Sequence, residues 1–138
     1  MLSENQPFEY RAALVNLEGG LDAIHESIAR LRKVARRDAD DPAVVRFETA
    51  VAEIGNNALT HGRVGTDRPV DYVLHWDGDT VVASLVDGGP PVELRWAHTM
   101  PPADSDAGRG IPLARALVDD LRYQRRGPIN SWMLIKRL

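Results

Sequence analysis

The sequence contains no cysteine among its 138 residues, which excludes disulfide bridges and metal sites built from thiolates. No apolar run approaches the roughly 20 residues that a membrane-spanning helix needs, so we expect no membrane partner. The opening stretch, MLSENQPFEYRAAL, has no basic region followed by an apolar one, and we therefore expect no secretory signal. These absences favour a cytoplasmic protein.

A strong charge of one sign is also missing. The net charge is −3 at pH 7, so despite a small basic patch at RRGP (125–128) we expect no direct contact with nucleic acid. Hydrophobic residues make up 43% and charged residues 27% of the chain, which is ordinary for a globular protein. The sequence shows no repeat, and its length indicates one domain over 1–138 that buries roughly two-thirds of its unfolded surface.

The patterns that are present predict an α+β fold. Alternating apolar residues and turn signals predict strands over 8–15, 69–76, 80–87, 121–126 and 131–138. Helical spacing predicts helices over about 21–37, 42–59 and 110–121. We expect the second helix to pack through five apolar residues: Val44, Val45, Phe47, Val51 and Ile54. Because the strands gather in hairpins and the helices are segregated, we expect a two-layer sandwich with a mixed, mainly antiparallel sheet covered by helices on one face.

Local signals place the ends of these elements. The Gly19-Gly20 pair breaks the chain before the first helix, Asp41 and Pro42 start the second, and His61-Gly62 is a glycine-terminated end. Residues 1–7 are polar and predict a loose terminus. Residues 90–107 are rich in Pro, Gly and Asp and predict a long mobile loop, which in a compact domain is usually functional.

The stretch FETAVAEIGNNALTHG (47–62) places Glu53, Asn57 and His61 four residues apart, in one row on a helix. A solvated helix face is the simplest interpretation. However, small neighbours suit a helix that something approaches closely: Ala50, Gly55 and Ala58. A carboxamide oxygen is a suitable ligand for Mg²⁺, and Glu53 one turn earlier suits the holding of a water or the removal of a proton.

Two further motifs follow. VDGGPP (86–91) ends an apolar strand, and is either a simple turn or a site where Asp87 accepts a hydrogen bond from an exocyclic amine while Gly89 leaves room for a flat ring. AGRGIPLARAL (107–117) opens a helix with Gly108 and Gly110, either to end the loop or to offer free N–H groups to a phosphate. It matches neither a Walker loop nor a Rossmann fingerprint.

The order of the three motifs resembles the ATP site of the GHKL superfamily, with its Bergerat-type fold. The short length narrows the resemblance to the anti-sigma-factor serine/threonine kinases, the RsbW and SpoIIAB group of histidine-kinase-like ATPase domains. The resemblance extends from about Tyr10 to Leu138, and the terminal GRGIPLARALVDDL is its most specific part.

The resemblance implies a role for each matching residue. Glu53 would be the general base, Asn57 the Mg²⁺ ligand, and His61 a basic group near the phosphates. Asp87 would accept a hydrogen bond from the adenine amine, and Gly89 would lie under the ring. The hinge and phosphate-binding positions after a lid over 90–107 would be Gly108 and Gly110, with Arg109 between them able to reach a phosphate.

The sequence departs from the family pattern at two places. Pro91 stands where a second glycine is common, and proline stiffens the start of the lid. The Gly-Thr of the last hairpin is replaced by Asn130-Ser131, where the hydroxyl of Ser131 would support adenine in its place.

The resemblance implies an ATP- and Mg²⁺-dependent serine/threonine kinase that is also an anti-sigma factor. Its partners would be a sigma factor and a STAS-domain anti-anti-sigma protein, and it would form a homodimer. The alternative is a module that binds ATP, or no nucleotide, and captures a regulator without phosphoryl transfer. The ATPase half of a sensor histidine kinase is disfavoured, because no helix with a phospho-accepting histidine precedes this domain.

Overall fold

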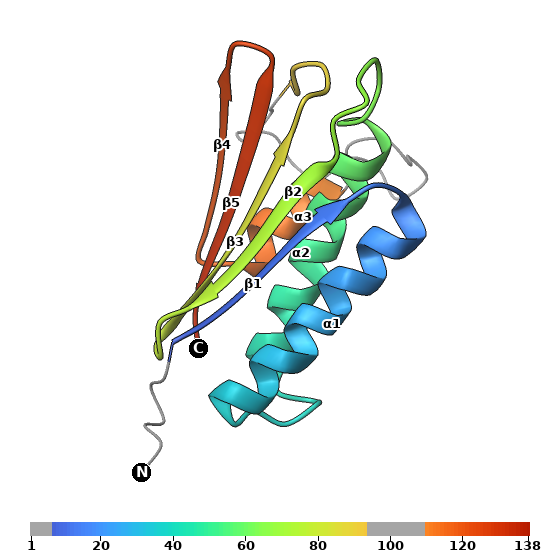
Figure 1. Ribbon diagram of the computed structural model, residues 1–138. Coiled ribbons are helices and arrows are strands. Elements are labelled where there is room, and N and C mark those ends of the chain that lie inside the picture. The colour runs from blue at the N-terminus through green and yellow to red at the C-terminus, as the bar shows by residue number, and fades with distance from the viewer. Residues whose placement is uncertain (1–6, 94–109) are drawn as a thin grey trace, which may run out of the picture.

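The computed structural model describes residues 7–93 and 110–138, which form a five-stranded sheet with helices on one face (Figure 1). The strands are β1 (Phe8–Leu14), β2 (Val70–Trp76), β3 (Thr80–Asp87), β4 (Asp120–Arg126) and β5 (Ile129–Arg137). The helices are α1 (Leu17–Ala35), α2 (Pro42–Thr60) and α3 (Gly110–Leu117). The expected two-layer α+β sandwich is confirmed.

The strand order is β1-β2-β3-β5-β4, and each neighbouring pair is antiparallel. The mixed sheet that we expected is therefore fully antiparallel in the described part of the chain. After β3 the chain passes through α3 and β4, and it returns in β5 beside β3. This path places the end of β3 next to the start of β5, with Asp87 opposite Asn130.

The sheet has one apolar face, because successive side chains of a strand point to opposite sides. On β2, Tyr72, Leu74 and Trp76 are buried, whereas Asp71 and His75 are exposed. The buried face packs against α1 and α2, which lie side by side across it in Figure 1. Their contribution to the core comes from apolar residues at helical spacing: Ile24, Ile28, Leu31, Val44, Phe47, Val51 and Ile54.

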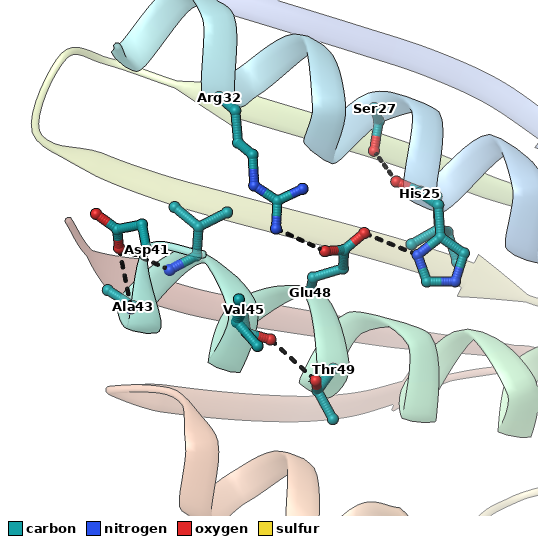
Figure 2. Close-up of polar contacts among 10 residues, drawn as sticks. His25, Ser27, Arg32, Asp41, Ala43, Val45, Glu48 and Thr49 are labelled. Carbon is teal, nitrogen blue, oxygen red and sulfur yellow. Dashed lines mark hydrogen bonds and ion pairs between the residues drawn. The ribbon is translucent and has the colours of Figure 1, made fainter. Parts of the chain in front are cut away.

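Polar contacts also join α1, α2 and the sheet. Figure 2 shows Glu48 of α2 between two residues of α1, with its carboxylate 2.8 Å from Nδ1 of His25 and 2.9 Å from a guanidinium nitrogen of Arg32. The buried Ser27 of α1 shares a hydrogen bond of 2.7 Å with the hydroxyl of Tyr72 on β2. Burial raises the pKa of that tyrosine, and the Ser27 contact opposes the shift.

The start of α1 differs from our expectation. The helix begins at Leu17, because the side chain of Asn16 accepts a hydrogen bond of 2.7 Å from the N–H of Gly19 and caps the first turn. The two glycines therefore lie inside the helix and do not break the chain. At Gly20 a Cβ would lie only 2.4 Å from Cδ1 of Leu59, so a larger residue there would displace the Leu59 side chain of α2.

Three other expectations need correction. Val45 was expected to pack inside, but it is 42% exposed, since one residue rotates a helical side chain by about 100° from its buried neighbour Val44. Helix α3 ends at Leu117, because β4 already begins at Asp120. The last hairpin turns at residues 127 and 128 alone, with Gly127 at φ 56°, and the strand β5 therefore includes Asn130.

Candidate functional site

The predicted row begins in the second half of α2 and extends to the residue that follows the helix. Glu53 and Asn57 are half-buried and His61 is exposed. His61 follows the last residue of the helix, and its backbone N–H donates to the carbonyl of Asn57 at 2.9 Å. One of the small neighbours of the row, Gly55, is approached closely by another helix. At Gly55 a Cβ would lie 2.5 Å from Cδ1 of Ile24, so the small residue serves packing of α2 on α1.

Glu53 lies against the first residue of α3. A Cβ at Gly110 would lie 2.7 Å from Oε2 of Glu53, so the carboxylate lies directly against this glycine and would have to move for a larger residue. The first N–H groups of a helix have no partner within the helix, and the positive end of its dipole favours negative charge. The structure thus joins the first and third sequence motifs, placing the Glu53 carboxylate beside a helix end that is suited to an anion.

Asp87 ends β3 and points toward the helix layer, where it is 2% exposed. Its Oδ1 accepts two hydrogen bonds, from the N–H of Gly89 at 3.0 Å and from the side-chain amide of Asn130 at 2.8 Å. A buried carboxylate needs such partners, because burial without them is costly. Among the residues that the structure describes, both hydrogen bonds to this carboxylate are made through Oδ1, and Oδ2 is left for another donor.

Two glycines bring the end of α2 against this carboxylate. A Cβ at Gly62 would lie 2.5 Å from the carbonyl oxygen of Ala58 and 2.6 Å from Oδ2 of Asp87. A Cβ at Gly89 would lie 2.5 Å from Cα of Gly62. Gly62 is therefore a site residue that the sequence argument missed, since it treated this glycine as a helix terminator. Its φ is not among the positive values of the described glycines, so space and not conformation requires glycine here.

Asn130 is the second residue that the sequence argument missed, because it was assigned to a turn. It is fully buried on β5 and contacts Asp87 directly. Ser131, which the resemblance had suggested for adenine support, follows it by one residue. Its side chain therefore points to the opposite face of the sheet, and the structure does not bring it to Asp87. The alternation along β5 would have identified Asn130 if the turn had been placed correctly.

Other expected site positions fall outside the described residues. Gly108, Arg109 and most of the expected lid over 90–107 belong to them, as do residues 1–6 of the loose terminus. The described start of that lid, Pro90 to Glu93, follows β3 directly. Pro90 and Pro91 are exposed, and the carbonyl of Pro90 accepts a hydrogen bond of 2.9 Å from Asn130.

The residues on α2 suit a magnesium ion that is held mainly by a ligand. Within 7–93 and 110–138 there is no group of three or more His, Asp or Glu side chains that would form a metal cage. Mg²⁺ usually keeps several waters and takes one or two protein oxygens together with phosphate oxygens. The half-buried carboxamide of Asn57 offers one such oxygen, one turn from Glu53.

Comparison with known families agrees with this arrangement. Residues 18–136 match the family described as histidine kinase-like ATPase domain, and the chain belongs to that family. A comparison with curated proteins finds no match. In the described residues no helix is both long and apolar enough to cross a membrane.

Among solved structures, the chain is similar to the crystal structure of the RsbU and RsbW domains of Rv1364c from Mycobacterium tuberculosis, with a TM-score of 0.68 and 19% sequence identity. The similarity covers 95% of this chain and 32% of the other, so this chain spans about a third of that protein. At this level of identity the similarity establishes the fold.

The two ends of the candidate site lie along one helix. Gly62, just after α2, contacts Asp87, and Glu53, nine residues earlier, contacts Gly110. At 1.5 Å per helical residue these contacts are about 14 Å apart, which suits an extended ligand. One end offers a buried carboxylate next to two glycines, and the other offers a helix end, an amide and a carboxylate. This pairing suits a ligand with an amine-bearing flat ring and a phosphate tail.

Proposed function

We propose that this protein is an ATP-dependent serine/threonine protein kinase that is also an anti-sigma factor. The supporting observation is that α2 meets Asp87 through Gly62, just after its last residue, and meets the start of α3 through Glu53, nine residues earlier. Adenine would bind at Asp87 through its exocyclic amine and lie over Gly89. The phosphates would lie toward Gly110, with Arg109 as a further basic group. His61 precedes Gly62 directly and so lies at the Asp87 end of the site, not beside Gly110.

Asn57 would hold Mg²⁺, which neutralises phosphate charge when it is bound. Glu53 would orient or deprotonate a seryl hydroxyl of a STAS-domain partner. Phosphoryl transfer depends mainly on positioning and charge stabilisation, so side chains on a rigid helix suit it. The similarity to a structure that contains RsbU and RsbW domains supports a partner-switching role, in which the same protein also binds a sigma factor.

The test separates catalysis from binding. Purified protein is incubated with labelled ATP, Mg²⁺ and a STAS-domain protein from the same genome. We expect Glu53→Ala to lower phosphate transfer roughly 10²- to 10⁴-fold and to leave ATP affinity nearly unchanged, because a general base acts in the transition state. Asn57→Ala should lose Mg²⁺-dependent ATP binding and transfer together. Asn56→Ala, at an exposed neighbouring position on the same helix, is the control.

A second function is favoured by one observation. Two hydrogen bonds join the segment after β3 to the last hairpin: Asn130 donates to the carbonyl of Pro90, and the N–H of Val92 donates to the hydroxyl of Tyr123. These bonds hold the start of the segment in place. A regulatory module that binds ATP and captures a sigma factor without phosphoryl transfer would use such a fixed surface. If the wild-type protein binds ATP and the STAS partner but never transfers phosphate, this module is the correct function and Glu53 is no base.

A further inference from the structure

The side-chain amide of Asn130 is surrounded by groups that fix its orientation. Its Nδ2 faces three oxygens, namely Oδ1 of Asp87 at 2.8 Å and the carbonyls of Pro90 at 2.9 Å and Gly89 at 3.3 Å. Its Oδ1 accepts hydrogen bonds from the hydroxyl of Tyr123 and, at 3.0 Å, from Arg125. The reversed amide would set its oxygen against three acceptors and its N–H groups against a guanidinium. Only one orientation therefore satisfies the site.

Tyr123 is itself fixed on two sides. The N–H of Val92 donates to its hydroxyl oxygen at 3.1 Å, which directs the hydroxyl proton toward Asn130. Its ring packs on Trp132, with centroids 4.6 Å apart. Arg125 adds a hydrogen bond of 2.9 Å to the carbonyl of Gly89. These three residues of the last hairpin, Asn130, Tyr123 and Arg125, form one connected cluster, here named the Asn130 cluster.

The Asn130 cluster determines which oxygen of Asp87 meets a ligand. Oδ1 already accepts from Asn130 and from the N–H of Gly89, while Oδ2 faces Gly62, the glycine that follows α2. As a carboxylate, Asp87 offers acceptors only. A ring that presents an amine to Oδ2 gains a charge-assisted hydrogen bond, whereas a ring that presents a carbonyl at the same position meets a second acceptor.

We propose that Asn130, held by Tyr123 and Arg125, is the positioning residue that makes Asp87 select a purine with an amine over one with a carbonyl at the same ring position. The proposal rests on the proposed nucleotide-binding function and extends it to the choice of base. Asn130 acts through Asp87, because the described contacts of its amide use its two N–H groups and its oxygen within the protein.

The experiment compares the affinity of ADP with that of inosine diphosphate, in which the amine is replaced by a carbonyl. Isothermal calorimetry on the wild type should show a preference for ADP on the order of 100-fold, because a site built to accept a hydrogen bond rejects an analogue that cannot donate it. Asn130→Ala should reduce that preference roughly tenfold, mainly through weaker ADP binding. Tyr123→Phe should shift it in the same direction by a smaller factor, since the phenyl ring keeps its packing on Trp132.

A purely structural defect would weaken both nucleotides equally and leave their ratio unchanged, so the ratio is the decisive readout. Met133→Ala, on the same strand but on the opposite face of the sheet, is the control and should change neither affinity. If Asn130→Ala does not fold, Tyr123→Phe decides the matter. If the variants keep the wild-type preference for ADP over inosine diphosphate, Asn130 does not position Asp87, and the proposed function is unaffected. If the wild type binds neither nucleotide, the proposed function is overturned as well.

Discussion

Helix α2 begins at a cap formed by a side chain next to it and ends against a strand that is distant in the sequence. At its start, Oδ1 of Asp41 accepts hydrogen bonds from the N–H groups of Ala43 at 3.0 Å and Val44 at 3.2 Å, and Pro42 occupies the first turn. At its end, Gly62 packs against Ala58 and against the buried Asp87. The first arrangement needs only neighbouring residues, and the second needs the whole sheet.

The difference has a physical basis and a functional consequence. A capping side chain satisfies N–H groups within three residues, so it forms wherever the local sequence allows it. A buried carboxylate is costly, and it is retained only where packing and hydrogen bonds hold it. The start of α2 therefore contributes to stability. Its end meets the carboxylate of Asp87, whose Oδ2 accepts no hydrogen bond from residues 7–93 and 110–138. Changes at the two ends should have separable effects.

The largest effect is expected from Gly62→Ala. The added methyl group would lie 2.5 Å from a backbone carbonyl and 2.6 Å from Oδ2 of Asp87, so either the end of α2 or β3 must shift. We expect a loss of about 1–3 kcal/mol in the free energy of unfolding, together with a loss of ADP binding. Urea denaturation and calorimetry measure the two quantities.

The matched control is Gly88→Ala. Its Cβ would meet Cδ of Arg68 at 3.2 Å, which is part of a flexible side chain that can move. Wild-type stability and ADP affinity in Gly62→Ala would show that α2 and β3 are not held together as closely as the structure indicates.

A smaller effect is expected from Asp41→Ala at the other end of the helix. The substitution removes both capping hydrogen bonds and should lower the free energy of unfolding by about 1 kcal/mol. ADP affinity should stay the same, because the cap lies at the far end of α2 from Asp87. Asp38→Ala, at an exposed position in the preceding loop, is the control for loss of charge. Weaker ADP binding in Asp41→Ala would mean that the two ends of α2 are coupled.

The middle of α2 tests a third kind of contact. Glu48→Gln weakens the interactions with Arg32 and His25, whose side chains are 17% and 51% exposed. Because the cluster is partly solvated, we expect a loss of up to about 1 kcal/mol, again by urea denaturation. Glu26→Gln weakens the pair with Arg30, whose side chains are 57% and 56% exposed, and should change the free energy of unfolding less. If Glu48→Gln and Glu26→Gln lose the same free energy of unfolding, partial burial does not strengthen the ion pairs of Glu48.

The smallest effect is a dependence on pH at the start of α2. The pKa of Asp41 lies below its usual 3.8, mainly because its carboxylate accepts a hydrogen bond from the N–H of Val44. Burial opposes this lowering of the pKa, and the hydrogen bonds from Arg37 and Ala43 add to it. A lowered pKa in the folded state means that this stability is present above the unfolded pKa and is lost as the pH falls through the lower folded pKa. Asp41→Asn keeps a capping side chain, so its stability should fall less steeply below about pH 4. Denaturation curves of the wild type and of Asp41→Asn at pH 7 and pH 3 give the free energy of unfolding of each protein. An equal loss of free energy in both proteins between the two pH values would exclude this contribution.

Much of the fold could be predicted from the sequence. The alternation in VDYVLHW and TVVASLVD identified β2 and β3, and the helical spacing from Val44 to Ile54 identified α2. Periodicity reports which side of an element is buried, and this information lies within a few residues. The errors were at element ends. Gly20 was expected before the first helix but lies inside α1. Gly62 follows the end of α2 as expected, but spacing alone did not reveal its contact with the distant Asp87.

The row of Glu53, Asn57 and His61 and the Asp-x-Gly after β3 were visible in the sequence by themselves, because each depends on spacing within one element. The start of α3 beside Glu53, the end of α2 beside Asp87 and the place of Asn130 were decided by tertiary structure alone. Asn130 is 43 residues from Asp87, and their hydrogen bond exists because β5 lies antiparallel to β3 in a particular register. A shift of that register by one residue would turn Asn130 to the opposite face of the sheet, since side chains alternate with a period of two.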